Sequence, residues 1–233
     1  SNNIDFNYAK YWDPSTAGEG GNIWRNIADE GHPSSPIFNP DGSLSFSAAY
    51  TVGDFIYGKN GTSSGNQDLR NTTSFESKFF NNTFRVKGDL TFRSRDLNSL
   101  RVRVPVPYST KAGEIVKLTT NMNDNLYQVN ENWRYLFGNI YGEYERTIGD
   151  HYFKGLLGYN YEQRAYNASY ITKNGLLNDN VENINLAVGQ STTATAKYNK
   201  YRNVGVFMRA NYIFKDRYLF EFNGRYDGSS KFP

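Results

Sequence analysis

Strict alternation of apolar and polar residues is the feature that most constrains this chain. Between Phe84 and Arg93, apolar side chains and one glycine occupy every second position, and polar or charged side chains fill the positions between them. The same period of two recurs in four further segments, at residues 134–145, 151–162, 203–214 and 218–226. Successive side chains of a β-strand point to opposite faces, so each segment predicts a long strand with one apolar and one polar face.

Short and long connections alternate between the predicted strands. We predict three hairpins that close through tight turns, at residues 69–94, 132–164 and 201–227. Residues 95–131 and 165–200 separate these hairpins and are expected to be long loops. Residues 1–68 are rich in glycine and turn signals, so we expect a loop-rich, extracellular segment with short strands near 4–11 and 44–56.

The alternation of short and long connections favours a transmembrane β-barrel over a soluble sheet. Outer-membrane barrels place short turns on one side and long loops on the other, with apolar residues towards lipid and polar residues towards the lumen. No apolar run reaches the roughly 18 residues of a transmembrane helix, whereas a transmembrane strand needs only about 9 to 11 residues. The expected fold class is all-β, an antiparallel transmembrane β-barrel segment of about six to seven strands, too few to close a barrel. A soluble all-β carbohydrate-binding or adhesin module remains the alternative.

Composition removes several classes of function. The absence of cysteine excludes a disulfide framework and thiolate catalysis. The net charge is +3, from 26 Lys and Arg against 23 Asp and Glu, and the charges are interspersed along the chain, so we expect no nucleic-acid partner.

We predict no catalytic residue, no metal site and no cofactor. Glu143 and Glu145 lie two positions apart on one strand face and could serve as the carboxylate pair of a glycosidase, but a polar lumen explains them more simply. His32 and His151 are the only histidines, and they lie far apart without the repeated spacing of metal ligands.

Two groups of residues are candidates for function. The first group consists of polar-face residues that we expect to face a lumen: Arg85, Lys87, Asp89, Arg93, Tyr141, Glu143, Glu145, Arg209 and Arg225. The second group consists of aromatic residues in the expected loops that could stack on sugar rings or contact a lid protein: Tyr11, Trp12, Trp24, Tyr166 and Tyr170. Packing of these aromatic side chains on one another is the alternative for the second group.

The end of the chain carries a specific motif. Residues 216–232 read DRYLFEFNGRYDGSSKF, in which a strand ends in the pattern RxDGSSxF. This motif resembles the barrel signature of the SusC/RagA-type TonB-dependent outer-membrane transporters of Bacteroidota. Residues 141–161, YGEYERTIGDHYFKGLLGYNY, are similar to a hairpin of the same family, and residues 39–43 and 84–96 match it more loosely. The resemblance covers roughly residues 36–233.

The resemblance implies a role in nutrient uptake at the bacterial outer membrane. Members of the family form a barrel of 22 strands that an N-terminal plug occludes, and they import oligosaccharides or peptides with energy from the TonB complex. A SusD-like surface lipoprotein caps the barrel, and outer-membrane lipid surrounds it. We expect this chain to be a middle piece of the barrel wall, without the plug, the TonB box or the signal peptide. The resemblance leaves open whether the substrate is a glycan or a peptide.

Overall fold

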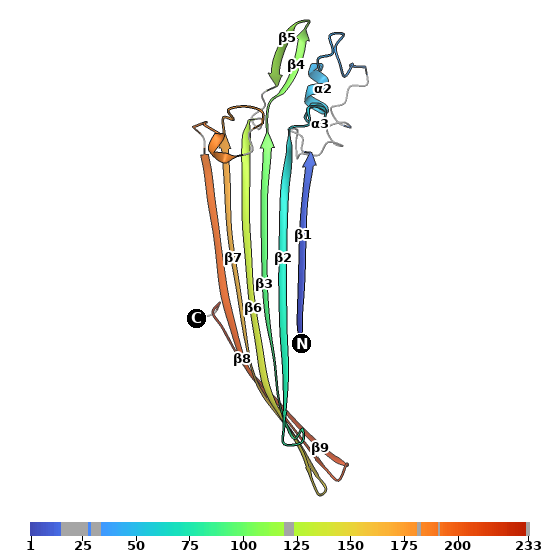
Figure 1. Ribbon diagram of the computed structural model, residues 1–233, viewed down its shortest axis with the longest axis vertical. Helices are drawn as coiled ribbons and strands as arrows, with labels where there is room; N and C mark the ends of the chain where they lie inside the picture. Colours follow the sequence, from blue (N-terminus) through green and yellow to red (C-terminus); the bar gives the residue numbers. More distant parts are fainter. Residues whose placement is uncertain (15–27, 29–33, 119–123, 181–182, 191, 232–233) are drawn as a thin grey trace.

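A single antiparallel sheet of seven strands forms most of the protein. The computed structural model describes residues 1–14, 28, 34–118, 124–180, 183–190 and 192–231. The sheet has the order β1-β2-β3-β6-β7-β8-β9 (Figure 1). Its strands are β1 (Asn2–Pro14), β2 (Gly61–Phe79), β3 (Phe84–Arg103), β6 (Asn125–Ile148), β7 (His151–Asn174), β8 (Thr192–Phe214) and β9 (Tyr218–Ser229). This architecture confirms the expected fold class of an open, antiparallel barrel segment.

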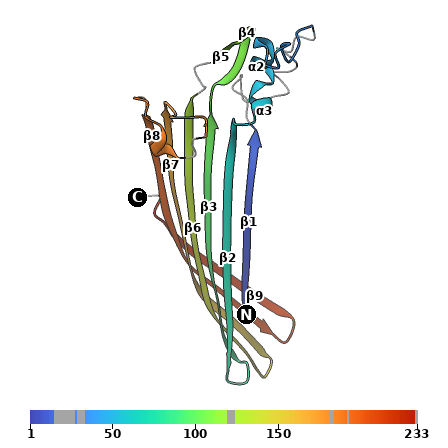
Figure 2. The same cartoon turned by 45° about the horizontal axis from the view of Figure 1, so that its top comes forward.

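The two ends of the sheet differ in what connects the strands. Residues 80–83, 149–150 and 215–217 make tight turns at one end, called here the turn end. The opposite end, called here the cap end, carries the remaining elements (Figure 2). These are helices α2 (Phe46–Thr51) and α3 (Gly53–Tyr57), the hairpin of β4 (Val106–Lys111) and β5 (Glu114–Leu118), and the 3₁₀ helix η2 (Ile184–Leu186). The predicted alternation of short and long connections is therefore present in the structure.

The tight turns have the backbone conformation that the right-handed twist of a hairpin favours. Asn81 and Asn82 have φ angles of 51° and 70°, and Lys215 and Asp216 have φ angles of 51° and 52°. Two consecutive positive φ angles are typical of a type I′ turn, which asparagine and aspartate tolerate better than other residues that carry a Cβ atom. Gly149 has a φ of 60° in the third turn, where its lack of a side chain avoids strain.

The pairing register divides the sheet into an apolar face and a polar face. Paired residues of antiparallel strands lie on the same face, so partners such as Phe92 and Leu136 belong to one face and Arg85 and Glu143 to the other. The apolar side chains concentrate in the half of the sheet nearest the turn end. We call this region the apolar band; it consists of the apolar-face positions within residues 84–92, 136–144, 153–161, 204–214 and 218–226.

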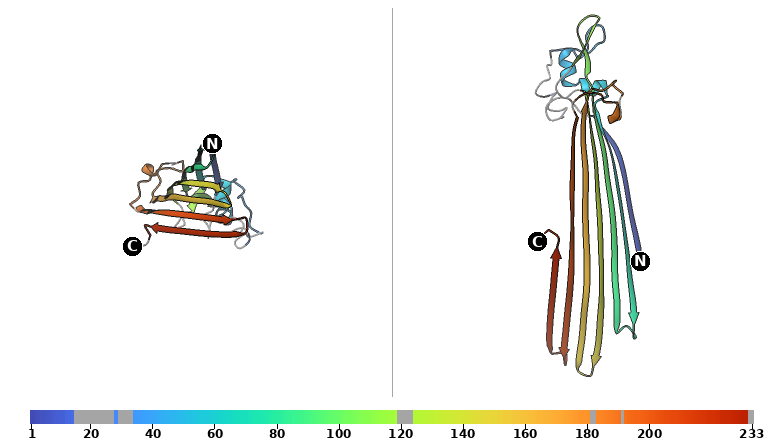
Figure 3. Two further views of the ribbon diagram at one scale, coloured as in Figure 1. Left: turned by 90° about the horizontal axis from the view of Figure 1, so that it is seen from below. Right: turned by 90° about the vertical axis from the view of Figure 1, so that its left-hand side faces the viewer.

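Large side chains of the apolar band are open to the surroundings. Leu157 is 63% exposed, Phe220 64% and Leu90 54%. Figure 3 shows the strands as one curved layer, with no other described element across this half of the sheet. An apolar surface of this extent is unfavourable in water and favourable in lipid. A soluble carbohydrate-binding or adhesin module would instead bury such a face against a second layer.

The apolar band has the height of a membrane crossing. On β3 the apolar face changes after Phe92 to Ser94, Asp96 and Asn98, while β6 carries Arg134 on the same face. A tilted strand crosses the hydrocarbon core in about 9 to 11 residues, which matches the length of the band on each strand. Towards the cap end both faces of β3, β6 and β7 carry mostly polar residues, so this part of the sheet extends beyond the hydrocarbon.

The strands are longer than the sequence predicted, and the loop assignments need correction. Residues 95–131 and 165–200 were expected to be long loops, but β3 continues to Arg103, β6 starts at Asn125, β7 continues to Asn174 and β8 starts at Thr192. The physical reason is that both faces of this half meet water. The hydrogen bonds between strands continue in this half, but the alternation of apolar and polar residues stops. A search for period-two hydrophobicity therefore could not detect the extended parts of the strands.

The segment 1–68 also differs from the expectation of a loop-rich region. The short strand expected near residues 4–11 is part of β1, and residues 61–68 belong to β2. The strand expected near residues 44–56 is wrong, because α2 and α3 occupy this range. Ser45 caps α2 by accepting a hydrogen bond from the backbone N–H of Ala48, an arrangement that favours a helix start.

Small apolar clusters hold the cap elements to the sheet end. Leu44, Ala48, Ala49 and Val106 form one cluster, and Leu126 and Ala187 form another. The buried Asn60 side chain contacts Val104, the residue that follows β3: its Nδ2 donates to the carbonyl of Val104 at 3.0 Å, and its Oδ1 accepts from the N–H of Val104 at 2.6 Å. The helices are thus fixed at the rim of the sheet. In the described part of the chain, no helix is long and apolar enough to cross a membrane.

Candidate functional site

The nine residues predicted to face a lumen all lie on the polar face of the sheet. Arg85 pairs with Glu143 and Lys87 with Tyr141 across β3 and β6. The register then places the remaining members on the same face: Asp89, Arg93, Glu145, Arg209 and Arg225. The face that carries them is opposite the apolar band.

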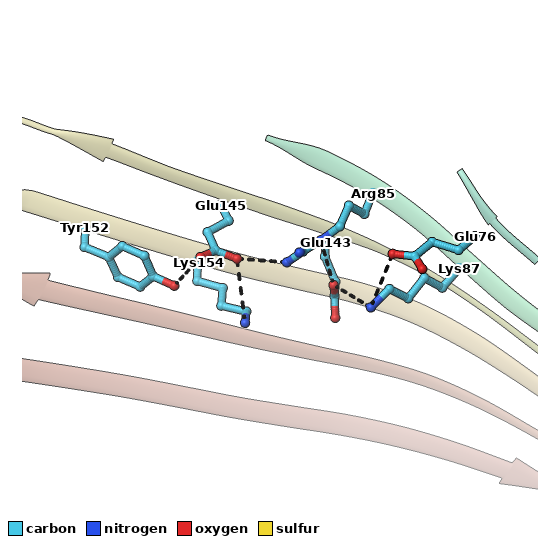
Figure 4. A network of polar contacts seen from close by, with 7 residues as sticks. All are labelled: Glu76, Arg85, Lys87, Glu143, Glu145, Tyr152 and Lys154. Atoms are coloured by element: carbon cyan, nitrogen blue, oxygen red, sulfur yellow. Dashed lines mark hydrogen bonds and ion pairs between the residues drawn. The ribbon is translucent and has the colours of Figure 1, made fainter. Parts of the chain in front are cut away.

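Five of these residues belong to different parts of the face, and four form a charge network near the turn end. Figure 4 shows this network across β2, β3, β6 and β7. Arg85 contacts Glu145 at 2.8 Å and Glu143 at 3.3 Å, and Lys87 contacts Glu143 at 3.2 Å. These ion pairs link strands β3 and β6 side chain to side chain.

Further side chains extend the network onto the neighbouring strands. Glu76 of β2 lies 3.9 Å from the Lys87 ammonium, and Lys154 of β7 lies 3.8 Å from Glu145. The Tyr152 hydroxyl donates to Glu145 at 2.9 Å. Each carboxylate therefore has cationic neighbours, and positive and negative charges balance along this part of the face. Exposed pairs contribute at most about 1 kcal/mol each, so the network orders side chains more than it stabilises the fold.

The ion pairs account for the two carboxylates considered as a glycosidase pair. Glu143 lies between Arg85 and Lys87, and Glu145 lies between Arg85 and Lys154. Both carboxylates are therefore engaged by cationic side chains of the same face, which is the arrangement of a charged wall. The described residues include no group of three or more His, Asp or Glu side chains arranged to hold a metal ion.

A second cluster lies on the polar face just beyond the apolar band, on the side of the cap end. Two neighbouring rows of register partners cross the sheet here. The first row contains Arg70, Arg93, Tyr135, Arg164 and Tyr201, and the second contains Asp68, Arg95, Trp133, Tyr166 and Asn199. A hollow of about 520 Å³ lies over these rows. We call its four arginines and four aromatic residues the arginine–aromatic surface.

Stacking and ion pairs order the arginine–aromatic surface. The Arg95 guanidinium lies 5.1 Å from the centre of the Trp133 ring, and the Arg164 guanidinium lies 5.2 Å from that of Tyr135. Arg164 also pairs with Glu162 at 2.9 Å. The rings of Trp133 and Tyr166 contact each other with centroids 5.2 Å apart. Cationic groups and ring faces therefore lie side by side on a polar surface.

The predicted aromatic contact residues lie in strands rather than in loops. Tyr11 is on the polar face of β1, whereas Trp12 is on the opposite face. Tyr166 and Tyr170 lie on the polar face of β7, and both hydroxyls donate to Glu131, at 3.1 Å and 2.5 Å. Trp24 lies outside the described residues. The loop assignment of these residues is thus wrong for the four that the structure describes.

The sequence interpretation missed most of the arginine–aromatic surface. Six of its eight residues were not among the candidates: Arg70, Arg95, Trp133, Tyr135, Arg164 and Tyr201. Their signal is a period of two in large polar and aromatic side chains, as in Trp133 and Tyr135 or in Arg164 and Tyr166. This signal could have been recognised only if the predicted strands had been continued past the residues that alternate between apolar and polar.

The comparisons with known proteins agree with the geometry. No family model matches the chain. TonB-dependent receptor P3 of Formosa agariphila is 25% identical over 223 residues, which cover 93% of this chain and 21% of that protein. The structure of the RagAB peptide transporter superposes with a TM-score of 0.56 at 16% identity, over 82% of this chain and 20% of that one. The RagAB peptide importer in its open-open state also gives a TM-score of 0.56 at 16% identity, over 99% of this chain and 26% of that one.

Sequence and fold together support the resemblance of this chain to a segment of a SusC/RagA-type barrel. The chain spans about a fifth of the length of the first relatives that it matches. Its place is the bacterial outer membrane, as the resemblance implied, and the exposed apolar band agrees with a lipid environment. The two relatives are named as a receptor and a transporter. These names agree with the interpretation of Glu143 and Glu145 as ion-paired residues of a barrel wall.

Proposed function

We propose that the protein containing this chain is a TonB-dependent importer of oligosaccharides or peptides, and that the chain supplies barrel wall and extracellular segments. The observation that carries the proposal is the sheet with two distinct faces. The apolar band meets lipid, and the charged face opposite it, including Arg85, Glu143 and Arg209, lines the lumen. The cap end, with its long connections, is the extracellular side.

The charge network of the turn end has a role in this arrangement. Alternating positive and negative side chains hydrate a lumen without a strong net field, and they offer hydrogen-bonding groups to a polar plug. The wall residues Arg85, Lys87, Glu143 and Glu145 are already paired with one another, so they keep the wall ordered when no plug contact is made.

The partners follow from the same family relation. A SusD-like lipoprotein would cover the cap end, where Phe46, Phe55, Ile56 and Val188 are exposed and available for contact. The TonB complex would act through an N-terminal region outside this chain. The RagAB structures are described as a peptide transporter, and this description supports a transport role more than a particular substrate class.

The assignment of the two faces can be tested with paired cysteine variants, because the chain has no cysteine of its own. Asn139→Cys lies on the polar face and Ile140→Cys in the apolar band of the same strand. With a nitroxide attached, we expect a water-soluble relaxation agent to reach position 139 and dissolved oxygen in the lipid to reach position 140. Equal access of the water-soluble agent to both positions would contradict the proposed orientation.

Transport itself requires a cellular assay. We expect uptake of a fluorescent oligosaccharide or peptide pool to depend on both the complete protein and TonB. Recovery of the complete protein in the soluble periplasmic fraction, or uptake that is unchanged without it, would refute the importer.

A further inference from the structure

We propose that the arginine–aromatic surface is a binding site for acidic oligosaccharides, which bear carboxylate or sulfate groups. The inference rests on the proposed function, since it names the substrate class of the importer. It begins with the location of the surface. The first row of the site is the register row directly beyond the apolar band, on the polar face, so a solute that passes from the cap end towards the membrane would meet it.

The charge of the surface selects for anions. Two of its four guanidinium groups have carboxylate partners, Arg93 with Asp68 and Arg164 with Glu162. In the part of the chain that the structure describes, Arg70 and Arg95 form no ion pair; Arg95 is held by Asn66, which accepts from its Nε at 3.3 Å. Two guanidinium groups with unused hydrogen-bond donors thus lie on neighbouring strands. The planar guanidinium fork matches the two oxygens of a carboxylate, and also those of a sulfate.

The aromatic side chains select for a flat, partly apolar ring. Trp133, Tyr135 and Tyr201 lie beside the arginines on the two strands β6 and β8, and all three line the hollow. A pyranose ring has an apolar face for such a platform and hydroxyl groups for the neighbouring donors. Adjacent strands are about 4.8 Å apart, so the row from Arg70 to Tyr201 spans roughly 19 Å, enough for several linked sugar rings.

The sheet geometry argues against an extended peptide at this site. Peptides commonly bind to sheets by adding a strand at an open edge, where the backbone groups are free. The rows of the site instead lie on the face of strands β3, β6 and β7, each of which pairs with a neighbour on both sides. Recognition must therefore come from side chains alone, and these are ring platforms with guanidinium groups.

Binding to the complete outer-membrane protein, purified in detergent, tests the inference. The probes are four hexamers: galacturonic acid, sulfated mannose, unmodified mannose and a hexaglutamate peptide. We expect the affinity measured by calorimetry to be at least about tenfold higher for the two acidic sugars than for the neutral sugar or the peptide. Added salt should lower the affinity for the acidic sugars. Comparison of the carboxylated with the sulfated sugar identifies the preferred acid. Equal or tighter binding of the neutral sugar or the peptide would overturn the inference.

Variants locate the site. Arg70→Gln combined with Arg95→Gln should weaken binding of the acidic sugars at least about tenfold, while Arg95→Lys alone should retain part of the affinity. Arg202→Gln is the matched control, because Arg202 lies on the opposite face and contacts Gln163. An equal loss of binding in the Arg202 variant, or no loss in the double variant, would overturn the assignment to this surface.

Uptake measurements separate this inference from the proposed function. TonB-dependent uptake of the neutral sugar or the peptide, without preference for the acidic sugars, would leave the importer standing and overturn the acidic site. Tight binding of the acidic sugars that is lost in the double variant, without TonB-dependent uptake of any probe, would support the site and refute the importer.

Discussion

Replacement of Leu157 by arginine should destabilise the membrane-inserted protein severely. Leu157 lies at the midpoint of the apolar band on β7, which runs from Phe153 to Tyr161, and its side chain is 63% exposed on the lipid side. An arginine at the bilayer midplane of a transmembrane barrel costs about 2 to 4 kcal/mol. This corresponds to a change in the folding equilibrium of roughly 30-fold to nearly 1,000-fold at room temperature.

The same strand supplies two controls. Leu156→Arg places the cation on the polar face, between Glu143 and Arg209, so it should cost less than about 1 kcal/mol. Asn167→Arg is on the same face as Leu157 but lies ten residues closer to the cap end. At about 3.3 Å per residue and a tilt of 45°, this is a depth of roughly 23 Å from the midplane, outside the hydrocarbon, where the cost falls to about 0 to 1 kcal/mol.

Urea titration of the complete protein in lipid vesicles would measure these free energies of unfolding, with heat-dependent mobility on gels as the readout of the folded barrel. The expected order of destabilisation is Leu157→Arg well above both controls. If Leu156→Arg proves as harmful as Leu157→Arg, the two faces have been assigned incorrectly. If Asn167→Arg proves as harmful, the apolar band extends farther towards the cap end than the sequence of that face indicates.

Three further predictions concern the turn end and the cap. Arg85→Gln should lower stability by no more than about 1 kcal/mol in the same urea titration, because Lys87 still neutralises Glu143; a larger loss would mean that the network is a main source of stability. Asn82→Val should cost about 1 to 2 kcal/mol, because position 82 has a φ of 70°, whereas Asn82→Gly should cost nothing measurable. Burial, together with the hydrogen bond to Asp179, raises the pKa of Tyr57 to about 12, so the stabilisation from this tyrosine is complete below pH 10, its ordinary pKa, and declines as the pH rises towards 12. A titration of tyrosinate absorbance, corrected with Tyr57→Phe, should show a lower Tyr57 pKa after Asp179→Asn, and an unchanged pKa would refute the role of the carboxylate.

The sequence predicted the part of the fold in which hydrophobicity carries structural information. Between Phe84 and Phe92 one face meets lipid and the other faces the charged side, so alternation, register and face all follow from the residue types. The tight turns were similarly readable from Asn81 and Gly149. The same alternation grouped the nine polar-face candidates in the sequence. The pairing register places all nine on one face of the sheet.

Other features depend on contacts that single segments do not encode. The cap-end halves of β6 and β7 are held by their neighbours in the ladder, although neither face is apolar. Helices α2 and α3 form where Ala48 and Ala49 pack on Val106, a residue more than fifty positions away in the chain. The arginine–aromatic surface draws its residues from five strands, and its existence as one site depends on the register among all of them.

The distribution of buried side chains explains why this sheet belongs to a larger closed structure. The buried hydrophobic residues of the described chain, such as Ala49, Val106, Leu126 and Ala187, belong to the cap and the cap end of the sheet, and none belongs to the apolar band. In the apolar band, the backbone hydrogen bonds between strands and the contact of apolar side chains with lipid stabilise the sheet in place of a buried core. Among the described residues, however, no strand pairs with the outer edge of β1 or of β9. Each unsatisfied group within hydrocarbon costs several kcal/mol, so the band is stable in a membrane only when further strands pair with both edges and close the barrel.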